Sequence, residues 1–122
     1  MTKTFYNNVL EHAKTNFSDI HRDIHIRHIF KNYRNNRGLN LTRFGLLVLH
    51  DMGFESESFI VEEDVKFTAH LRIILDRYNK YPYYIDRMRI VLFGEEDRIL
   101  FKLYGKDLEA WVEHMEENLK KD

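Results

Sequence analysis

Two runs of alternating apolar residues flank an acidic turn and predict a β-hairpin over residues 88–103. If Phe93 pairs with Arg98 across the turn at 94–97, every pair on one face of the hairpin is apolar. A shift of one residue would destroy that sorting, so the pattern fixes the register. A lone hairpin is barely stable in water, and the apolar face must therefore lie against helices. That face pairs Leu92 with Ile99, Ile90 with Phe101 and Met88 with Leu103, while the other pairs Val91 with Leu100 and Arg89 with Lys102.

Apolar residues at helical spacing predict about five helices packed around this hairpin. The third of them, over 42–52, is apolar most of the way round, which predicts a central and buried position. Between the third and fourth helices, Phe59, Ile60 and Val61 form a short strand or a plug. The predicted fold class is α+β and mostly helical, with one C-terminal antiparallel hairpin, in a single domain over 1–122. The other helices are expected over 4–16, over 65–79 and after an N-cap at Asp107. One more helix is expected to begin at a cap of Ser18 or Asp19 and to stop at 35–38, with an apolar stripe of Ile26, Ile29, Phe30 and Tyr33.

The order of helices followed by a hairpin matches a winged-helix arrangement, in which 42–52 and 65–79 are the helix pair and 88–104 is the wing. Two features count against this interpretation. The linker between the two helices is long for a tight turn, and the tip of the hairpin at 94–97 is acidic and would repel a phosphate backbone.

The composition bounds the compartment and the chemistry. The chain has no cysteine, which excludes disulfides and thiolate metal sites and favours a reducing compartment. Its first residues lack the apolar run of a signal peptide, and no stretch reaches the roughly 18 apolar residues of a membrane span. No glycine-rich phosphate loop and no GxSxG motif is present. We therefore expect a soluble, cytoplasmic, non-enzymatic protein with no cofactor and no membrane contact.

Charge is divided into blocks along the chain, although the net charge is only −1. Residues 21–43 carry six basic residues and one acidic residue, whereas residues 51–64 carry six acidic residues and no basic one. Neighbouring blocks could neutralise one another across the fold, or the basic block could form a binding face.

Basic residues interleaved with asparagine and aromatic residues predict a nucleic-acid-binding surface. Arginine and lysine neutralise phosphates, while asparagine can bond to bases or sugars. The aromatic residues Phe30, Tyr33 and Phe44 also fit the helical stripes, which favours a place in the core. The candidate residues are Arg27, Lys31, Arg34, Arg37 and Arg43, with a second patch of Arg87, Arg89 and Lys102; on the hairpin, that patch could equally be a solvated edge that discourages aggregation.

Two further clusters suggest other partners. Tyr81, Tyr83 and Tyr84 surround Pro82 and form a candidate protein-binding corner, or else the corner that packs the fourth helix on the hairpin. With the acidic segment 51–64 this corner supports an alternative function, an adaptor or inhibitor that grips a host protein. His21, His25 and His28 share one helical face and form a weak candidate metal site, because exposed histidines on a basic face are common.

The stretch YPYYIDRMRIVLFGEEDRILFKLYGKDLEAW, with RGLNLTRFG upstream, resembles small uncharacterised proteins of large tailed bacteriophages, notably those that infect cyanobacteria. The shared pattern is an aromatic turn, an apolar strand, an acidic turn, a strand and a short helix, within residues 37–112. Arg98 departs from it, since a small residue is expected there. The resemblance implies a phage accessory or regulatory protein acting inside a bacterial cell, and it implies no reaction.

Overall fold

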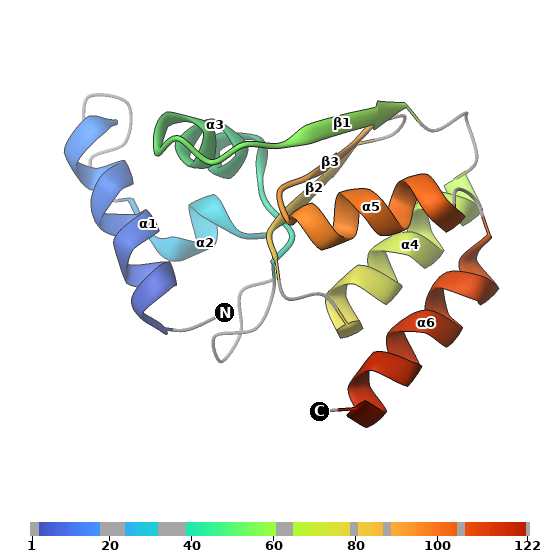
Figure 1. Cartoon of the computed structure of the whole chain (residues 1–122). Coiled ribbons are helices and arrows are strands. Elements are labelled where there is room, and N and C mark those ends of the chain that lie inside the picture. The colour runs from blue at the N-terminus through green and yellow to red at the C-terminus, as the bar shows by residue number, and fades with distance from the viewer. Residues whose placement is uncertain are drawn as a thin grey trace.

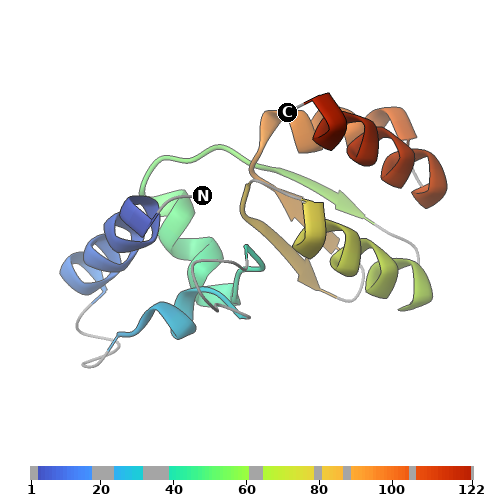
Figure 2. The same ribbon diagram turned by 90° about the horizontal axis from the view of Figure 1, so that it is seen from below.

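The computed structural model describes residues 3–17, 24–31, 39–60, 65–78, 81–86, 89–104 and 107–121. They form an α+β fold that is mostly helical, as predicted, with one three-stranded antiparallel sheet in the middle of the chain. Figures 1 and 2 show α1, α2 and α3 together at one end of the sheet, whereas α4 and α5 lie along the sheet and α6 packs beside them. The elements are α1 (Lys3–Asn16), α2 (Ile26–Ile29), α3 (Arg43–Asp51), β1 (Glu57–Ile60), α4 (Val65–Tyr78), β2 (Tyr83–Asp86), β3 (Arg89–Leu92), α5 (Glu95–Tyr104) and α6 (Leu108–Lys121).

Strand β3 is the centre of the sheet, and its two neighbours are β1 and β2. Leu92 lies opposite Glu57 on one side and Tyr83 on the other, and Arg89 lies opposite Ile60 and Asp86. Since side chains alternate along a strand, the register sorts them onto two faces. Tyr83, Ile85, Phe59, Ile90 and Leu92 share one face, and Tyr84, Asp86, Ser58, Ile60, Arg89 and Val91 share the other.

The predicted hairpin over 88–103 is wrong. Residues 89–92 do form a strand, but the segment that was expected to pair with them is helix α5. Both edges of β3 are already occupied by β1 and β2, so no edge is left for a strand at 98–103. The sequence also suits a helix, because Glu95, Glu96 and Asp97 fall in its first turn, where the helix dipole favours negative charge. As a result Leu100 is buried, whereas Leu103 is 70% exposed.

The winged-helix arrangement is therefore not confirmed. Its wing required the hairpin at 88–104, and that segment is half helix. The strand β1, between α3 and α4, is where Phe59 and Ile60 predicted a short strand. Among the described residues 24–31, the second predicted helix is the single turn α2, after which Phe30 forms an antiparallel bridge with Leu41. The parts of that prediction before residue 24 and after residue 31 lie outside the described residues.

Helix α3 begins and ends where its sequence indicates. Thr42 is the N-cap, and its Oγ1 accepts a hydrogen bond of 2.9 Å from the backbone N–H of Gly45. Gly53, just past the end, has a φ of +93°, a conformation that favours glycine. The prediction that α3 is buried is confirmed for Leu46, Val48 and Leu49, whereas Leu47 is 56% exposed.

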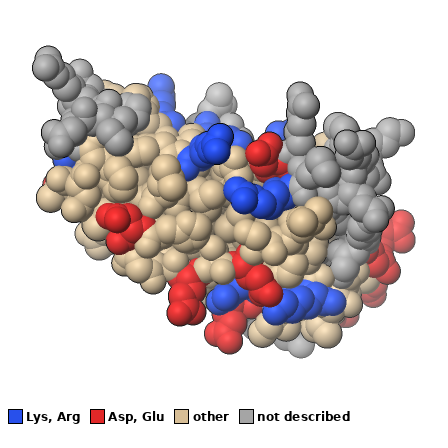
Figure 3. All heavy atoms as spheres, turned by 90° about the horizontal axis from the view of Figure 1, so that it is seen from above, with Lys and Arg blue, Asp and Glu red and all other residues tan. Residues whose placement is uncertain are grey.

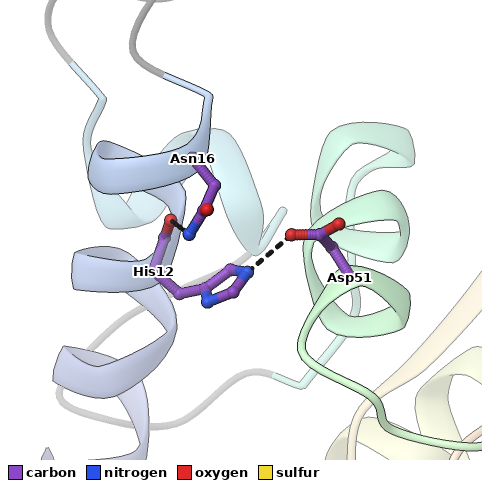
Figure 4. Close-up of polar contacts among 3 residues, drawn as sticks. All are labelled: His12, Asn16 and Asp51. Carbon is purple, nitrogen blue, oxygen red and sulfur yellow. Dashed lines mark hydrogen bonds and ion pairs between the residues drawn. The ribbon is translucent and has the colours of Figure 1, made fainter.

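Helix α3 packs against both N-terminal helices. Gly45 allows α3 to approach α2 closely, since a Cβ at that position would lie 2.1 Å from the carbonyl oxygen of Ile29. Figure 4 shows a contact with α1, in which His12 Nε2 of α1 lies 2.7 Å from Asp51 Oδ2 of α3. On α1 itself, Asn16 Nδ2 donates a bond of 3.0 Å to the carbonyl oxygen of His12.

The C-terminal helices cover one face of the sheet. Phe101 of α5 lies against Phe59, with ring centroids 4.5 Å apart, and α4 packs on β2. Tyr104 of α5 contacts His114 of α6. Asp107 caps α6 as predicted, because its Oδ1 accepts a bond of 3.1 Å from the N–H of Ala110.

Candidate nucleic-acid interface

One face of the sheet is left partly open by this arrangement. It is the face of Tyr84, Asp86, Ser58, Ile60, Arg89 and Val91, opposite to the face that α5 contacts through Phe59. Tyr84 and Val91 are buried, whereas Ser58, Asp86 and Arg89 are exposed and Ile60 is 81% exposed. We call this surface the open face. Figure 3 views the molecule from above and shows basic side chains near the middle of that view, beside a wide uncharged area, with acidic side chains gathered toward the lower edge.

Lys31 reaches the open face from the segment that follows α2. Its Nζ lies 5.3 Å from the centroid of the Tyr84 ring and 3.5 Å from the carbonyl oxygen of Ile85. Such a cation over an aromatic ring is attracted by the negative face of the ring. These two contacts hold the ammonium group of Lys31 in position. Because Lys31 is exposed, the group is still accessible to solvent.

Arg89 reaches the same face from β3. It lies opposite Asp86 on β2 and Ile60 on β1, so these three side chains form one row across the sheet. The adjacent row is Tyr84, Val91 and Ser58. Lys31 therefore lies over one row and Arg89 belongs to the next, while Asp86 contributes a carboxylate between the two cations.

A hydrogen bond joins the two segments that carry Arg27 and Arg43. Thr42 Oγ1 donates to the carbonyl oxygen of His28 over 2.5 Å and contacts that of Ile29 at 3.1 Å. This bond links α2, which carries Arg27, to the start of α3, which carries Arg43. Both arginines are exposed. Four of the predicted basic residues are therefore exposed: Arg27 on α2, Lys31 in the segment after α2, Arg43 on α3 and Arg89 on β3.

The other predicted basic residues do not join this group. Lys102 lies on α5, where its Nζ forms an ion pair of 2.9 Å with Glu57 Oε2, so its expected place beside Arg89 is wrong. That error follows from the hairpin, which would have put the two residues on facing strands. Arg34, Arg37 and Arg87 lie outside the described residues.

Two of the three tyrosines in the predicted protein-binding corner are packed inside the protein. Tyr83 and Tyr84 are buried, whereas Tyr81 is 38% exposed and lies close to Gly94. The Tyr83 hydroxyl donates a hydrogen bond to Asp76 Oδ1 on α4. Burial and this carboxylate raise the pKa of Tyr83 well above its usual range. Desolvation also raises the pKa of Asp76, although the hydrogen bond from Tyr83 and the charge of Arg72 oppose that rise.

The histidines show no metal site in the part of the chain that the structure describes. His25 and His28 have ring centroids 5.8 Å apart, and His21 lies outside the described residues. No group of three or more potential ligands gathers among the described side chains. Ser56 and His50 do form a hydrogen bond of 2.7 Å, and the imidazole of His50 also packs on Phe93. We read this pair as a link between α3 and the sheet.

Sequence reasoning missed β2, and with it the open face. Tyr83, Tyr84, Ile85 and Asp86 were interpreted as a corner between a helix and a hairpin. The available signal was the run of Tyr83, Tyr84 and Ile85, residue types that favour strands, shortly before the strand at 89–92, and the structure pairs Ile85 with Ile90 and Asp86 with Arg89. Asp86, Ser58 and Ile60 were therefore not recognised as members of the same surface as Arg89.

Comparisons with protein-family models, with curated proteins and with solved structures found no match for this chain. Among the described helices, none is both long enough and apolar enough to cross a membrane.

Proposed function

We propose that this protein binds nucleic acid, without catalysis, through the exposed cations Arg27, Lys31, Arg43 and Arg89. The observation that carries the proposal is that Lys31 and Arg89, which are distant in the sequence, lie over adjacent rows of the same sheet face. Phosphate groups repeat along a nucleic-acid backbone, and separate cations on one surface can neutralise several of them together.

The burial of Tyr84 indicates the mode of contact. Its ring is only 6% exposed and lies beneath Lys31, so it offers no free platform on which a base could stack. Phosphate contacts position a nucleic acid but do not read its sequence. We therefore propose binding to the backbone with little dependence on base composition, and Asp86 would weaken it by its negative charge.

On this proposal the chain is an accessory or regulatory protein of a tailed bacteriophage, as its resemblance implies, and acts in the cytoplasm of the infected bacterium. Its target would be nucleic acid, or a machine bound to nucleic acid. The alternative is an adaptor or inhibitor that binds a host protein through the acidic segment 51–64 and the tyrosine corner, and the burial of Tyr83 and Tyr84 removes most of the tyrosine part of that surface.

Binding should be measured by fluorescence polarisation with labelled single-stranded DNA, duplex DNA and RNA over a series of salt concentrations. Each phosphate contact on a duplex contributes a slope of about −0.9 to log affinity against log salt. If all four cations contact phosphate, the slope should be about −3.6. Absence of binding to all three probes at low salt would refute the proposal.

A charge-reversed double variant, Lys31→Glu with Arg89→Glu, tests the surface itself. The matched control is Lys3→Glu with Lys14→Glu, because both lysines are exposed on α1 and the change in net charge is the same. We expect the first variant to lose at least about tenfold in affinity and the control to lose far less. Equal losses would show that only net charge matters and that the open face is not the binding surface.

A further inference from the structure

Strand β1 is an edge of the sheet. It pairs only with β3, and no described residue pairs with its other side. In an antiparallel strand, alternate residues direct their N–H and C=O groups to opposite sides, so about half of those in β1 point away from the sheet. Edge strands are commonly protected from further pairing by short length, charged side chains, proline or a bulge. Strand β1 is short and carries Glu57, but it has neither lysine nor proline, and its ladder to β3 is continuous.

A hollow of about 350 Å³ lies where the chain enters β1 and faces α5. Three carboxylates and two cations line it, together with the half-exposed Ile99. Lys102 already pairs with Glu57, which leaves the carboxylates of Glu55 and Glu95 to face Arg98. A lysine or arginine side chain suits this hollow, because its stem can contact Ile99 while its charge meets the carboxylates. The lining residues are Glu55, Glu57, Glu95, Arg98, Ile99 and Lys102.

We propose that β1 accepts an extended segment of a partner protein as an additional strand, with a basic side chain of that segment in the hollow beside Glu55. Main-chain hydrogen bonds between β1 and the added strand would provide the affinity, as in other cases of strand addition. The hollow would provide specificity for a basic side chain. This surface differs from the four cations proposed to bind nucleic acid, so the two proposals stand or fall separately.

Charge favours a basic partner over a second copy of this chain. Residues 51–64 contain six acidic residues and no basic one. Two copies paired along β1 would therefore bring acidic segments together, and like charges on neighbouring strands are destabilising. A basic segment would instead be attracted to them.

The test uses the full chain and a short fluorescent peptide of alternating valine and lysine, with a valine–glutamate peptide for comparison. We expect the lysine peptide to bind and the glutamate peptide not to bind. Strand addition also predicts that amide hydrogen exchange within 57–60 slows when the lysine peptide is bound, because outward N–H groups gain acceptors.

Two substitutions distinguish an effect at the free edge of β1 from a general effect of added positive charge. Ser58→Lys places a lysine on the exposed side of β1, and Thr15→Lys places one on the exposed side of α1 as its control. We expect Ser58→Lys to weaken peptide binding about tenfold, and Thr15→Lys to change it little. Glu55→Gln should weaken binding of the lysine peptide as well.

Several results would overturn the proposal. These are equal binding of the two peptides, lysine-peptide binding without slower exchange within 57–60, and equal effects of Ser58→Lys and Thr15→Lys. A dimer in sedimentation that Ser58→Lys dissociates would identify a second copy as the occupant instead.

Discussion

Lys31 lies over the ring of Tyr84, with its Nζ 5.3 Å from the ring centroid, and this contact ties the segment after α2 to the sheet. Exposed contacts of this kind contribute about 0.5–1 kcal/mol. The same lysine is a proposed phosphate ligand, and substitutions can separate its structural role from that proposed role.

Lys31→Ala should lower the free energy of unfolding by about 0.5–1 kcal/mol, because the contact with Tyr84 is lost. Lys31→Arg should keep most of the stability and the nucleic-acid affinity, since arginine also binds aromatic faces and phosphate. Urea denaturation gives the stability, with Lys14→Ala on α1 as the control. If Lys31→Ala were no less stable than Lys14→Ala, the contact would contribute nothing.

Tyr83→Phe should destabilise the protein by about 1 kcal/mol, because it removes the hydrogen bond to Asp76 and leaves that carboxyl group without its donor. The measurement is chemical denaturation at neutral pH. Tyr81→Phe is the matched control, since Tyr81 is partly exposed. A loss for Tyr81→Phe as large as for Tyr83→Phe would contradict this account.

Asp76 should make stability depend on pH in a defined direction. Its pKa is higher in the folded protein than in the unfolded chain, so between the two values the folded state binds more protons. Its contribution is therefore largest in acid, below the unfolded value near 3.8, and is lost as the pH rises through the folded value. Asp76→Asn should remove this contribution, so its stability relative to the parent should rise with pH over that range. A relative stability independent of pH would count against the raised pKa.

Thr42→Ala should lower stability by about 1–2 kcal/mol, because Thr42 both caps α3 and bonds to the carbonyl oxygen of His28. Thr42→Ser keeps the hydroxyl group and should recover most of that loss. Thermal denaturation of the two variants against the parent checks the expectation. The same loss in both would show that the methyl group matters and the hydroxyl group does not.

Gly45→Ala should destabilise the protein by about 1–3 kcal/mol or more, because the new Cβ would meet the backbone of Ile29 and push α2 away from α3. Leu47→Ala, two residues along the same helix, removes an exposed side chain and should change stability far less. Urea denaturation compares the two. A neutral Gly45→Ala would mean that the two helices can separate without loss.

The sequence by itself determined the helices α1, α3, α4 and α6, because their apolar spacing and the capping residues Thr42 and Asp107 act locally. It also indicated which residues are basic and exposed. It did not decide the partners of the strand at 89–92. Residues 98–103 alternate like a strand and also have apolar residues at helical spacing, so both structures are locally consistent.

Tertiary structure made that choice, because β3 has two edges and β1 and β2 occupy both of them. In this sheet Arg89 lies beside Asp86 and Ile60. Lys31 lies over Tyr84 of β2, and Lys102, on a helix instead of a strand, pairs with Glu57 and not with Arg89. Helix formation depends on neighbours within one turn, and a single chain segment contains that information. Strand pairing depends on which segments compete for a shared edge, and only the folded chain settles that competition.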